Sequence, residues 1–408
     1  MRKITLLSLA GVLIPLSLLS NTKLVRAADT TYDIHPLVHD ISYGDEMINI
    51  PHKVEINING DIDKYTKNEA YDVLAIKGVL ASTKEDYSNF KLNISINNDS
   101  SNGLFEKLDA YTLSIDEDSI DIVGKDDRSC FYALQSLREI FNQSGNEVRE
   151  LTINDYSNSL YRGVIEGLYG VPYNNFEIED MIEFISKYKA NTFFYGPRHD
   201  SYFRTAWREL LPRDELMMLE EVATYAKSRK VDFYFGLNPV ETRSFTMANY
   251  ERDYEVFIAR FEQAYSVGIR HFFISADDVI GETIEPELHV RFMNDLAAWA
   301  KEKGDCGRIV LTPSCYCGSG VDVLGVSFDY LTALRALDET IDIFWTGYDI
   351  TSNVSTGDFE RFYEMIGREP IFWLNWPVND YAPTRIIMSK GEMLDVTYEN
   401  EEDRKSVV

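Results

Sequence analysis

The stretch HFFISADD, residues 271–278, is a short apolar run that ends in two adjacent aspartates. Its aromatic and β-branched side chains suit a buried β-strand. Asp277 and Asp278 follow where such a strand would end. The stretch therefore raises two questions: which kind of sheet contains this strand, and why the strand ends in two carboxylates.

Six further apolar runs share this pattern, and amphipathic segments separate most of them. The predicted strands are 160–167, 191–197, 231–239, 271–278, 308–314, 341–347 and 370–377. Helical periodicity occurs at 178–189, 215–230, 254–268 and 290–304. Strands that alternate with helices in this way are typical of a parallel sheet covered on both faces. Seven strands fit either a doubly wound sheet or an eight-stranded barrel that lacks its last strand.

The ends of the strands favour the barrel. Nearly every strand ends in polar residues or in glycine and proline, namely Glu166-Gly167, Gly196-Pro197-Arg198, Asn238-Pro239, Asp277-Asp278, Thr312-Pro313, Thr346-Gly347 and Asn375-Trp376-Pro377. Functional groups at the carboxyl ends of many strands are the layout of a TIM barrel. A dinucleotide-binding sheet would instead carry one G-x-G-x-x-G turn, which the sequence lacks. We predict an α/β fold in which residues 158–408 form a TIM (β/α)8 barrel, truncated before or within strand eight.

The residues before the barrel have a different pattern. Residues 28–157 are predicted to form a small α+β domain with strands at 53–58, 91–96, 110–115 and 119–124 and a helix at 128–141. Residues 1–27 read as a signal peptide, with Arg2 and Lys3, an apolar run and an A-x-A type cleavage site at 25–27. The alternative is an uncleaved anchor. We expect a secreted protein with no membrane attachment after cleavage.

Charge and cysteine content argue against several classes of function. The formal net charge is −27, and removal of the four basic residues of 1–27 leaves −31. This charge opposes binding to nucleic acid and to anionic glycans such as hyaluronan. Four cysteines make no disulfide framework, although a bridge between Cys306 and either Cys315 or Cys317 stays open.

The adjacent aspartates allow three interpretations. They could form a solvated turn or helix cap, they could belong to a metal site, or they could be a catalytic pair. Two carboxylates that converge on one cavity disfavour double ionisation, so one can act as an acid while the other remains an anion. Glycoside hydrolysis requires this division of roles. Neighbouring carboxylates suit a scheme in which a 2-acetamido group of the substrate is the nucleophile.

Several motifs in fixed order resemble glycoside hydrolase family 84, the β-N-acetylglucosaminidases often described as hyaluronidases or O-GlcNAcases. They are RGVIEGLYGVPY (162–173), NTFFYGPRHD (191–200) followed by YFRTAWRELLP (202–212), FISADDV (273–279), FWTG (344–347) and FWLNWPVNDY (372–381). The resemblance covers roughly 160–388, and the preceding domain resembles the small domain found before family 20 and 84 barrels. It implies a retaining, substrate-assisted β-N-acetylglucosaminidase that uses no metal or other cofactor and acts on GlcNAc-containing glycans or glycoproteins.

The resemblance also implies roles for individual residues. Asp277 would orient and polarise the acetamido N–H group, and Asp278 would be the general acid and base. The other expected contacts with the sugar are the Gly163 carbonyl, Arg198, the Tyr316 hydroxyl at the acetamido oxygen, Thr346 and Trp373 around the acetamido methyl group, and Asn375 and Asp380 at the outer hydroxyls. For Trp373 the plain alternative is barrel core, and for Asn375 and Asp380 it is loop capping.

Three departures from the family pattern matter. Arg198 replaces a lysine, Leu168 and Tyr173 replace a phenylalanine and a tryptophan, and an asparagine expected just after strand eight is not found. Arginine is a planar fork rather than a point charge, so sugar preference or affinity would differ. The missing strand and Arg198 keep open the alternative of a catalytically silent GlcNAc-binding protein. A hyaluronidase is a second alternative, which the charge of the mature chain disfavours.

Overall fold

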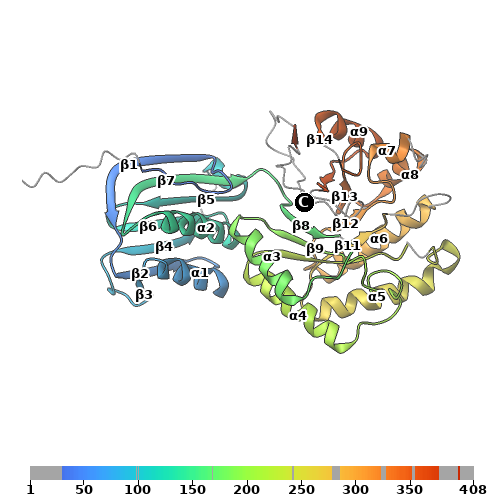
Figure 1. The fold of residues 1–408 in the computed structure, drawn as a ribbon, viewed down its shortest axis with the longest axis horizontal. Helices are drawn as coiled ribbons and strands as arrows, with labels where there is room; N and C mark the ends of the chain where they lie inside the picture. The colour runs from blue at the N-terminus through green and yellow to red at the C-terminus, as the bar shows by residue number, and fades with distance from the viewer. Residues whose placement is uncertain are drawn as a thin grey trace, which may run out of the picture.

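The computed structural model describes residues 30–97, 99, 101–167, 169–240, 243–277, 285–322, 328–351 and 354–375, and the backbone of 394–395. The described residues form two large sheets, each of seven strands, and a short two-stranded pair of β14 (Val354–Ser355) with β16 (Leu394–Asp395). Figure 1 shows the first sheet at one end of the molecule and the second sheet, with its helices, at the other.

The first sheet belongs to the N-terminal part of the chain and is mixed. Its order is β1-β7-β5-β6-β4-β2-β3, with antiparallel pairs from β1 to β6 and parallel pairs from β6 to β3. The strands are β1 (Asp40–Asn49), β2 (Lys53–Asn59), β3 (Leu80–Ser82), β4 (Lys91–Ile96), β5 (Leu108–Ile115), β6 (Ser119–Gly124) and β7 (Glu147–Ser157). Helices α1 (Lys64–Ala75) and α2 (Asp127–Gln143) lie on the same face of this sheet (Figure 1).

The two α-helices of this part, α1 and α2, are each capped by an aspartate at the amino end. Asp63 accepts the backbone N–H groups of Tyr65 and Thr66, and Asp126 accepts that of Ser129. Such caps satisfy donors that a helix start leaves unpaired. The sequence predicted α2 and four of the strands, but it did not predict β1, β3, β7 or α1.

The second sheet is parallel throughout and has the order β15-β13-β12-β11-β10-β9-β8. Its strands are β8 (Gly163–Glu166), β9 (Thr192–Tyr195), β10 (Asp232–Leu237), β11 (His271–Ser275), β12 (Ile309–Thr312), β13 (Ile341–Trp345) and β15 (Ile371–Phe372). All seven lie within the predicted strands. Strand eight would fall after residue 375, where only 394–395 are described, and it stays a prediction.

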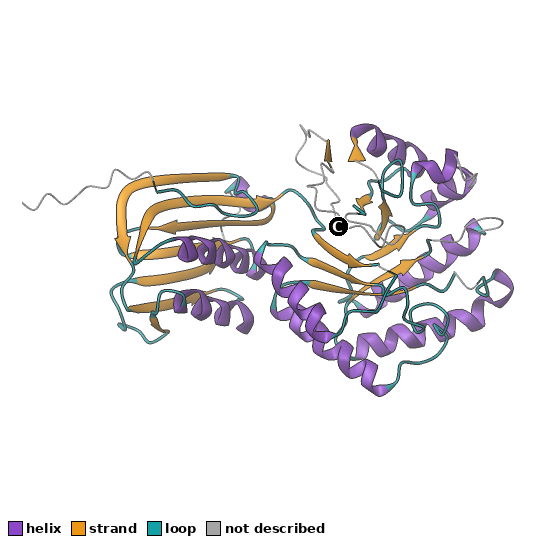
Figure 2. Cartoon of the chain, in the orientation of Figure 1, coloured by secondary structure: helices purple, strands orange, loops and turns teal. Residues whose placement is uncertain are grey.

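Helices connect these strands and cover the outside of the curved sheet, as Figure 2 shows. They are α3 (Asn175–Lys187), α4 (Arg213–Ser228), α5 (Tyr250–Ser266), α6 (Pro286–Lys303), α7 (Gly318–Asp322), α8 (Phe328–Ala333) and α9 (Thr356–Ile366). Capping boxes begin α3, at Asn174 and Glu177, and α9, at Ser355 and Asp358. A partial TIM barrel preceded by a small α+β unit confirms the predicted fold class.

A mostly aromatic core fills the inside of the partial barrel. It consists of Tyr161, Phe194, Phe203, Tyr234, Phe273, Val310, Phe344, Ile371 and Trp373. Phe194 stacks on Tyr234 at 4.2 Å between ring centroids and meets Phe273 and Phe344 edge-on. Layers of side chains from neighbouring strands fill the inside of a TIM barrel. The inside of this partial barrel is likewise a packed core and not a pore.

The small domain is joined to the amino ends of the barrel strands by charged contacts. Lys189, just before β9, lies 3.1 Å from Asp155 on β7. Arg162, just before β8, lies 2.7 Å from Asp109 on β5, and Asp232, the first residue of β10, lies 2.6 Å from Arg128 on α2. The small domain therefore holds the end of the barrel opposite to the carboxyl ends of its strands.

Some expectations lie outside this description or fail. Residues 1–29, which include the predicted signal peptide, are not among the described residues. The four cysteines are free, so the bridge left open between Cys306 and Cys315 or Cys317 does not form. Within the described ranges, no helix is both long and apolar enough to cross a membrane.

Candidate active site

The carboxyl ends of four neighbouring strands bring together most of the residues predicted for the site. Asp277 follows β11, Tyr316 follows β12, Thr346 follows β13 and Trp373 follows β15. These strands are consecutive in the sheet, and the carboxyl ends of parallel strands meet at one edge. Arg198 reaches the same edge from the loop after β9.

Asp277 is a buried carboxylate with a donor on each oxygen. Its exposed fraction is 2%, and that of Arg198 is 3%. The Arg198 guanidinium forms an ion pair with Oδ2, and the Ser275 hydroxyl donates to Oδ1. A carboxylate is kept inside a protein at acceptable cost only when it is paired and hydrogen-bonded, and Asp277 meets both conditions.

Tyr316, Thr346 and Trp373 form a connected group beside Asp277's strand. The Thr346 backbone N–H and hydroxyl both donate to the Tyr316 carbonyl, at 2.9 and 3.2 Å. The Tyr316 and Trp373 rings stack with centroids 6.2 Å apart, and Trp373 also packs on Phe344. Trp373 is therefore part of the barrel core, which was the plain alternative for it, and its contact with the acetamido methyl group stays a prediction.

Of the remaining predicted residues, the structure describes some and not others. Asn375 donates its side-chain amide to the Ile350 carbonyl at 2.9 Å, so part of its hydrogen-bonding capacity serves the loop after β13. Asp278 and Asp380 lie outside the described residues. The role of the adjacent carboxylate therefore rests on its position in the chain, directly after Asp277.

The expectation for Gly163 is wrong about its location. Gly163 is the first residue of β8 and pairs with Thr192, the first residue of β9, so it lies at the end of the barrel held by the small domain. A Cβ at this position would come within 1.8 Å of the Thr192 carbonyl oxygen, which explains why a glycine is needed here. The site end of β8 is followed by Gly167, where an added Cβ would lie 3.3 Å from the Trp373 ring.

Sequence reasoning noted Glu166, the last residue of β8, only as a polar strand end and gave it no role. Its exposed fraction is 1%, and Oε1 accepts the backbone N–H of Tyr173 at 2.9 Å. Within the described part of the chain, Oε2 is buried and has no hydrogen-bond partner. Burial raises the pKa of Glu166 to about 7. One carboxylate within an otherwise apolar strand was the signal that could have identified it, as the one hydroxyl in HFFIS could have identified Ser275.

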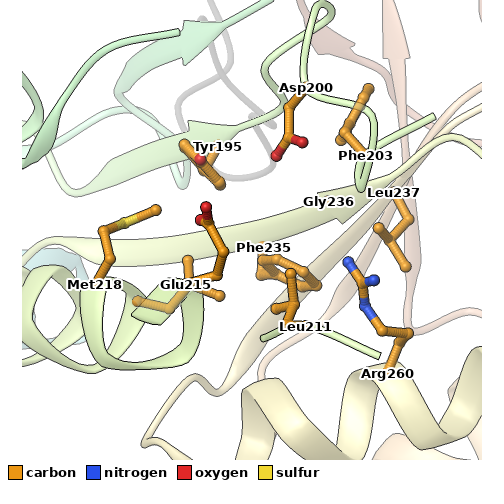
Figure 3. A pocket seen from close by; sticks show the side chains of 11 residues that line it. Tyr195, Asp200, Phe203, Leu211, Glu215, Met218, Phe235, Gly236, Leu237 and Arg260 are labelled. Atoms are coloured by element: carbon orange, nitrogen blue, oxygen red, sulfur yellow. The ribbon is translucent and has the colours of Figure 1, made fainter. Parts of the chain in front are cut away.

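A small cavity lies next to the loop that carries Arg198. Figure 3 shows Asp200 and Glu215 facing it, with the Arg260 guanidinium close by. Its volume of about 10 Å³ accommodates roughly one water molecule and no sugar ring. None of the predicted site residues lines it, so this cavity is not the candidate active site.

The donor groups of the site indicate its chemistry. No group of three or more histidine, cysteine, aspartate or glutamate side chains that could hold a metal ion occurs among the described residues. The site edge instead combines a fixed carboxylate with a phenol and an indole ring. A carboxylate accepts an N–H group, a phenol can donate to a developing negative charge, and an indole packs against an apolar group.

Comparison with known families separates the chain into the same two parts. A family model described as beta-N-acetylglucosaminidase matches residues 162–404. A second model, described as glycosyl hydrolase family 20, domain 2, matches residues 31–156. The first match covers more than half of the 408 residues.

Individual proteins agree with these matches. Protein O-GlcNAcase from Rattus norvegicus is 24% identical over 234 residues, which are 55% of this chain and 25% of that protein. The solved structure of CpGH84D is 34% identical, with a TM-score of 0.82 over 92% of this chain and 66% of that one. For CpGH84B the identity is 27% and the TM-score is 0.74 over 86% and 63%. The chain thus spans about a quarter of the length of the rat protein.

Proposed function

Because the chain belongs to the β-N-acetylglucosaminidase family, glycoside hydrolase family 84, we propose that it hydrolyses terminal β-linked GlcNAc with retention of configuration. One observation carries this proposal: a buried carboxylate with two donors, Asp277, stands at a strand end beside Asp278 and next to the Tyr316, Thr346 and Trp373 group. That arrangement suits a substrate that brings its own acetamido nucleophile.

Each residue has a defined task in this reaction. Asp277 accepts the acetamido N–H and turns the carbonyl oxygen toward the anomeric carbon. Asp278 protonates the leaving oxygen and later deprotonates the attacking water. The Tyr316 hydroxyl donates to the acetamido oxygen as the oxazoline ring forms, while Trp373 and Thr346 enclose the methyl group. The protein acts outside the cell, since residues 1–27 have the pattern of a signal peptide.

A panel of nitrophenyl glycosides tests the proposal. Nitrophenyl β-GlcNAc should be hydrolysed, and the β-glucoside, which lacks the acetamido group, should not. A GlcNAc-derived thiazoline should inhibit competitively and much more tightly than GlcNAc, because it mimics the cyclised intermediate. Equal turnover of the glucoside, or full activity in millimolar thiazoline, would show that the substrate does not supply the nucleophile.

A further inference from the structure

Two donors from different strands hold the carboxylate of Asp277. The Ser275 hydroxyl, on β11 itself, donates to Oδ1, and Arg198, after β9, donates from Nη2 to Oδ2. We propose that Ser275 and Arg198 form a clamp that fixes the plane of this carboxylate, and that both are positioning residues for the acetamido group. The proposal deepens the proposed function and rests on it.

The mobility of an aspartate explains why a clamp is needed. The torsion that turns the carboxylate plane is broad and roughly two-fold, so packing alone defines it poorly. A reacting group must be held within roughly 0.5 Å and 10–20° of its productive geometry. One donor on each oxygen removes the freedom that packing leaves. Ser275, Arg198 and Asp277 are each no more than 3% exposed, so water does not compete for these contacts.

Both donors are themselves mounted on fixed backbone. Ser275 pairs with Thr312 of β12 in the parallel ladder, which sets the direction of its side chain. The Arg198 carbonyl accepts a hydrogen bond from Arg204 Nη1 at 2.9 Å, and its guanidinium lies 5.8 Å from the centroid of the Phe203 ring. The loop after β9 therefore directs the arginine toward β11.

This arrangement explains what an arginine at position 198 does that the family's lysine would not do. A lysine ammonium is a rotating point charge, whereas a guanidinium is planar and orients the carboxylate that it pairs with. Arginine also stays protonated at every relevant pH, so the charge beside Asp277 is permanent. In this arrangement Arg198 acts on Asp277, whereas the resemblance implied that it contacts the sugar directly.

Variants of both donors test the clamp. Ser275→Ala should lower kcat about 10-fold and Arg198→Met about 100-fold or more, with KM changed less, because the oriented amide matters most as the ring closes. Arg198→Lys, which keeps the cation but loses the planar guanidinium, should recover only part of the loss. Thiazoline affinity should fall in parallel with kcat/KM, while GlcNAc affinity changes less. Such a split would not follow from a loss of stability alone.

Ser314→Ala is the matched control. Ser314 is also a buried serine, but its hydroxyl donates to the Ala276 carbonyl at 2.6 Å and not to Asp277. The ratio of thiazoline to GlcNAc affinity should stay at the wild-type value in this variant. The clamp is wrong if Ser275→Ala and Arg198→Met also keep that ratio and the wild-type kcat.

Crystal structures separate failure of the clamp from failure of the proposed function. A wild-type protein that neither hydrolyses GlcNAc glycosides nor binds thiazoline would overturn the proposed function. In that case the orientation of Asp277 in crystals of wild type, Ser275→Ala and Arg198→Met still decides the clamp. A carboxylate plane that is rotated in both variants supports it, and an unchanged plane in both overturns it.

Discussion

Glu166 lies at the last position of β8 with its carboxyl group buried, and its pKa is raised to about 7 by that burial. The folded protein therefore holds a proton on Glu166 that the unfolded chain, with an ordinary glutamate, releases near pH 4.5. Stability from this group is complete below that pH and is lost as the pH rises toward 7. The difference corresponds to about 3 kcal/mol.

Glu166→Gln should remove this pH dependence. The amide oxygen can still accept the Tyr173 N–H, and glutamine carries no charge to bury. We expect the variant to gain stability over wild type between pH 5 and pH 8, as measured by urea unfolding at both values. Glu220→Gln, at an exposed position on α4, is the control. A constant difference between Glu166→Gln and wild type across this range would contradict the prediction.

Asp278 and Asp277 should respond differently to loss of charge. Asp278→Asn should slow substrates with poor leaving groups strongly and spare activated aryl glycosides, since a good leaving group needs little protonation. Asp277→Asn should slow both, because both depend on the oriented acetamido group. Initial rates with methyl and nitrophenyl β-GlcNAc compare the two cases. Equal losses on both substrates for Asp278→Asn would rule out its role as the acid.

At this scale the sequence predicted the residue types of the site better than their contacts. The order of the motifs predicted roles for Asp277, Tyr316, Thr346 and Trp373, and the structure brings these four residues to one edge of the sheet. The motifs misplaced Gly163, because a four-residue strand has two ends and the glycine-rich motif spans both. The roles of Ser275 and Glu166 were missed because they depend on partners from other segments.

Two helices, α6 and α8, support the loop that carries Tyr316. His289 of α6 hydrogen-bonds to the Tyr330 hydroxyl of α8 at 3.0 Å, and that hydroxyl accepts the backbone N–H of Ser314 at 3.0 Å. His289 is buried, and burial lowers its pKa to about 4. The folded protein thus keeps a neutral histidine that the unfolded chain protonates below pH 6.5. Stability from this group is present above pH 6.5 and is lost as the pH falls toward 4.

His289→Gln should weaken the acid sensitivity of the fold. The amide can bond to the Tyr330 hydroxyl without titrating. On acidification from pH 6.5 to 4 the variant should therefore lose about 3 kcal/mol less of its unfolding free energy than wild type loses. Urea unfolding at pH 7 and pH 4.5 measures this effect. His52→Gln changes an exposed histidine and should leave the wild-type profile intact. The explanation fails if His289→Gln loses as much stability on acidification as wild type does.

Elements were predicted well where periodicity or apolar runs define them, and poorly where they do not. The barrel strands are short and mostly buried, as continuous apolar runs indicated. β1 and β7 carry many polar side chains, and their long antiparallel pairing joins segments about a hundred residues apart. Such pairing depends on tertiary context that a local pattern does not contain.

Across the whole molecule, buried charge joins the small domain to the barrel. Lys189 and Asp155 have side-chain exposures of 7% and 8%, and the Tyr111 hydroxyl bonds to both. Burial alone would raise the pKa of Asp155, but Lys189 and its other donors outweigh burial and lower it. Sequence could not predict this contact, because Lys189 takes a φ of 59°, in a turn where glycine is usual.

Removal of one partner should therefore cost more than removal of both. Asp155→Asn leaves Lys189 buried beside a neutral amide, which should destabilise the protein by about 3 kcal/mol. Asp155→Asn combined with Lys189→Met should recover part of that loss. Thermal unfolding of the two single variants and the double variant measures the coupling. The exposed pair of Arg291 and Glu251 supplies the comparison, and Glu251→Gln should change little. Additive losses for the buried pair would contradict the proposed coupling.

The ion pairs between the small domain and the amino ends of the barrel strands have a practical consequence. Asp109 contacts the barrel through Arg162, whereas exposed Glu117 lies in the turn at the other end of the β5–β6 hairpin. A strand of this length separates the two by roughly 20 Å. A cysteine introduced at Glu117 is therefore a suitable position for a tether. A protein immobilised on a bead through that turn would present the edge with the candidate active site to the surrounding solution.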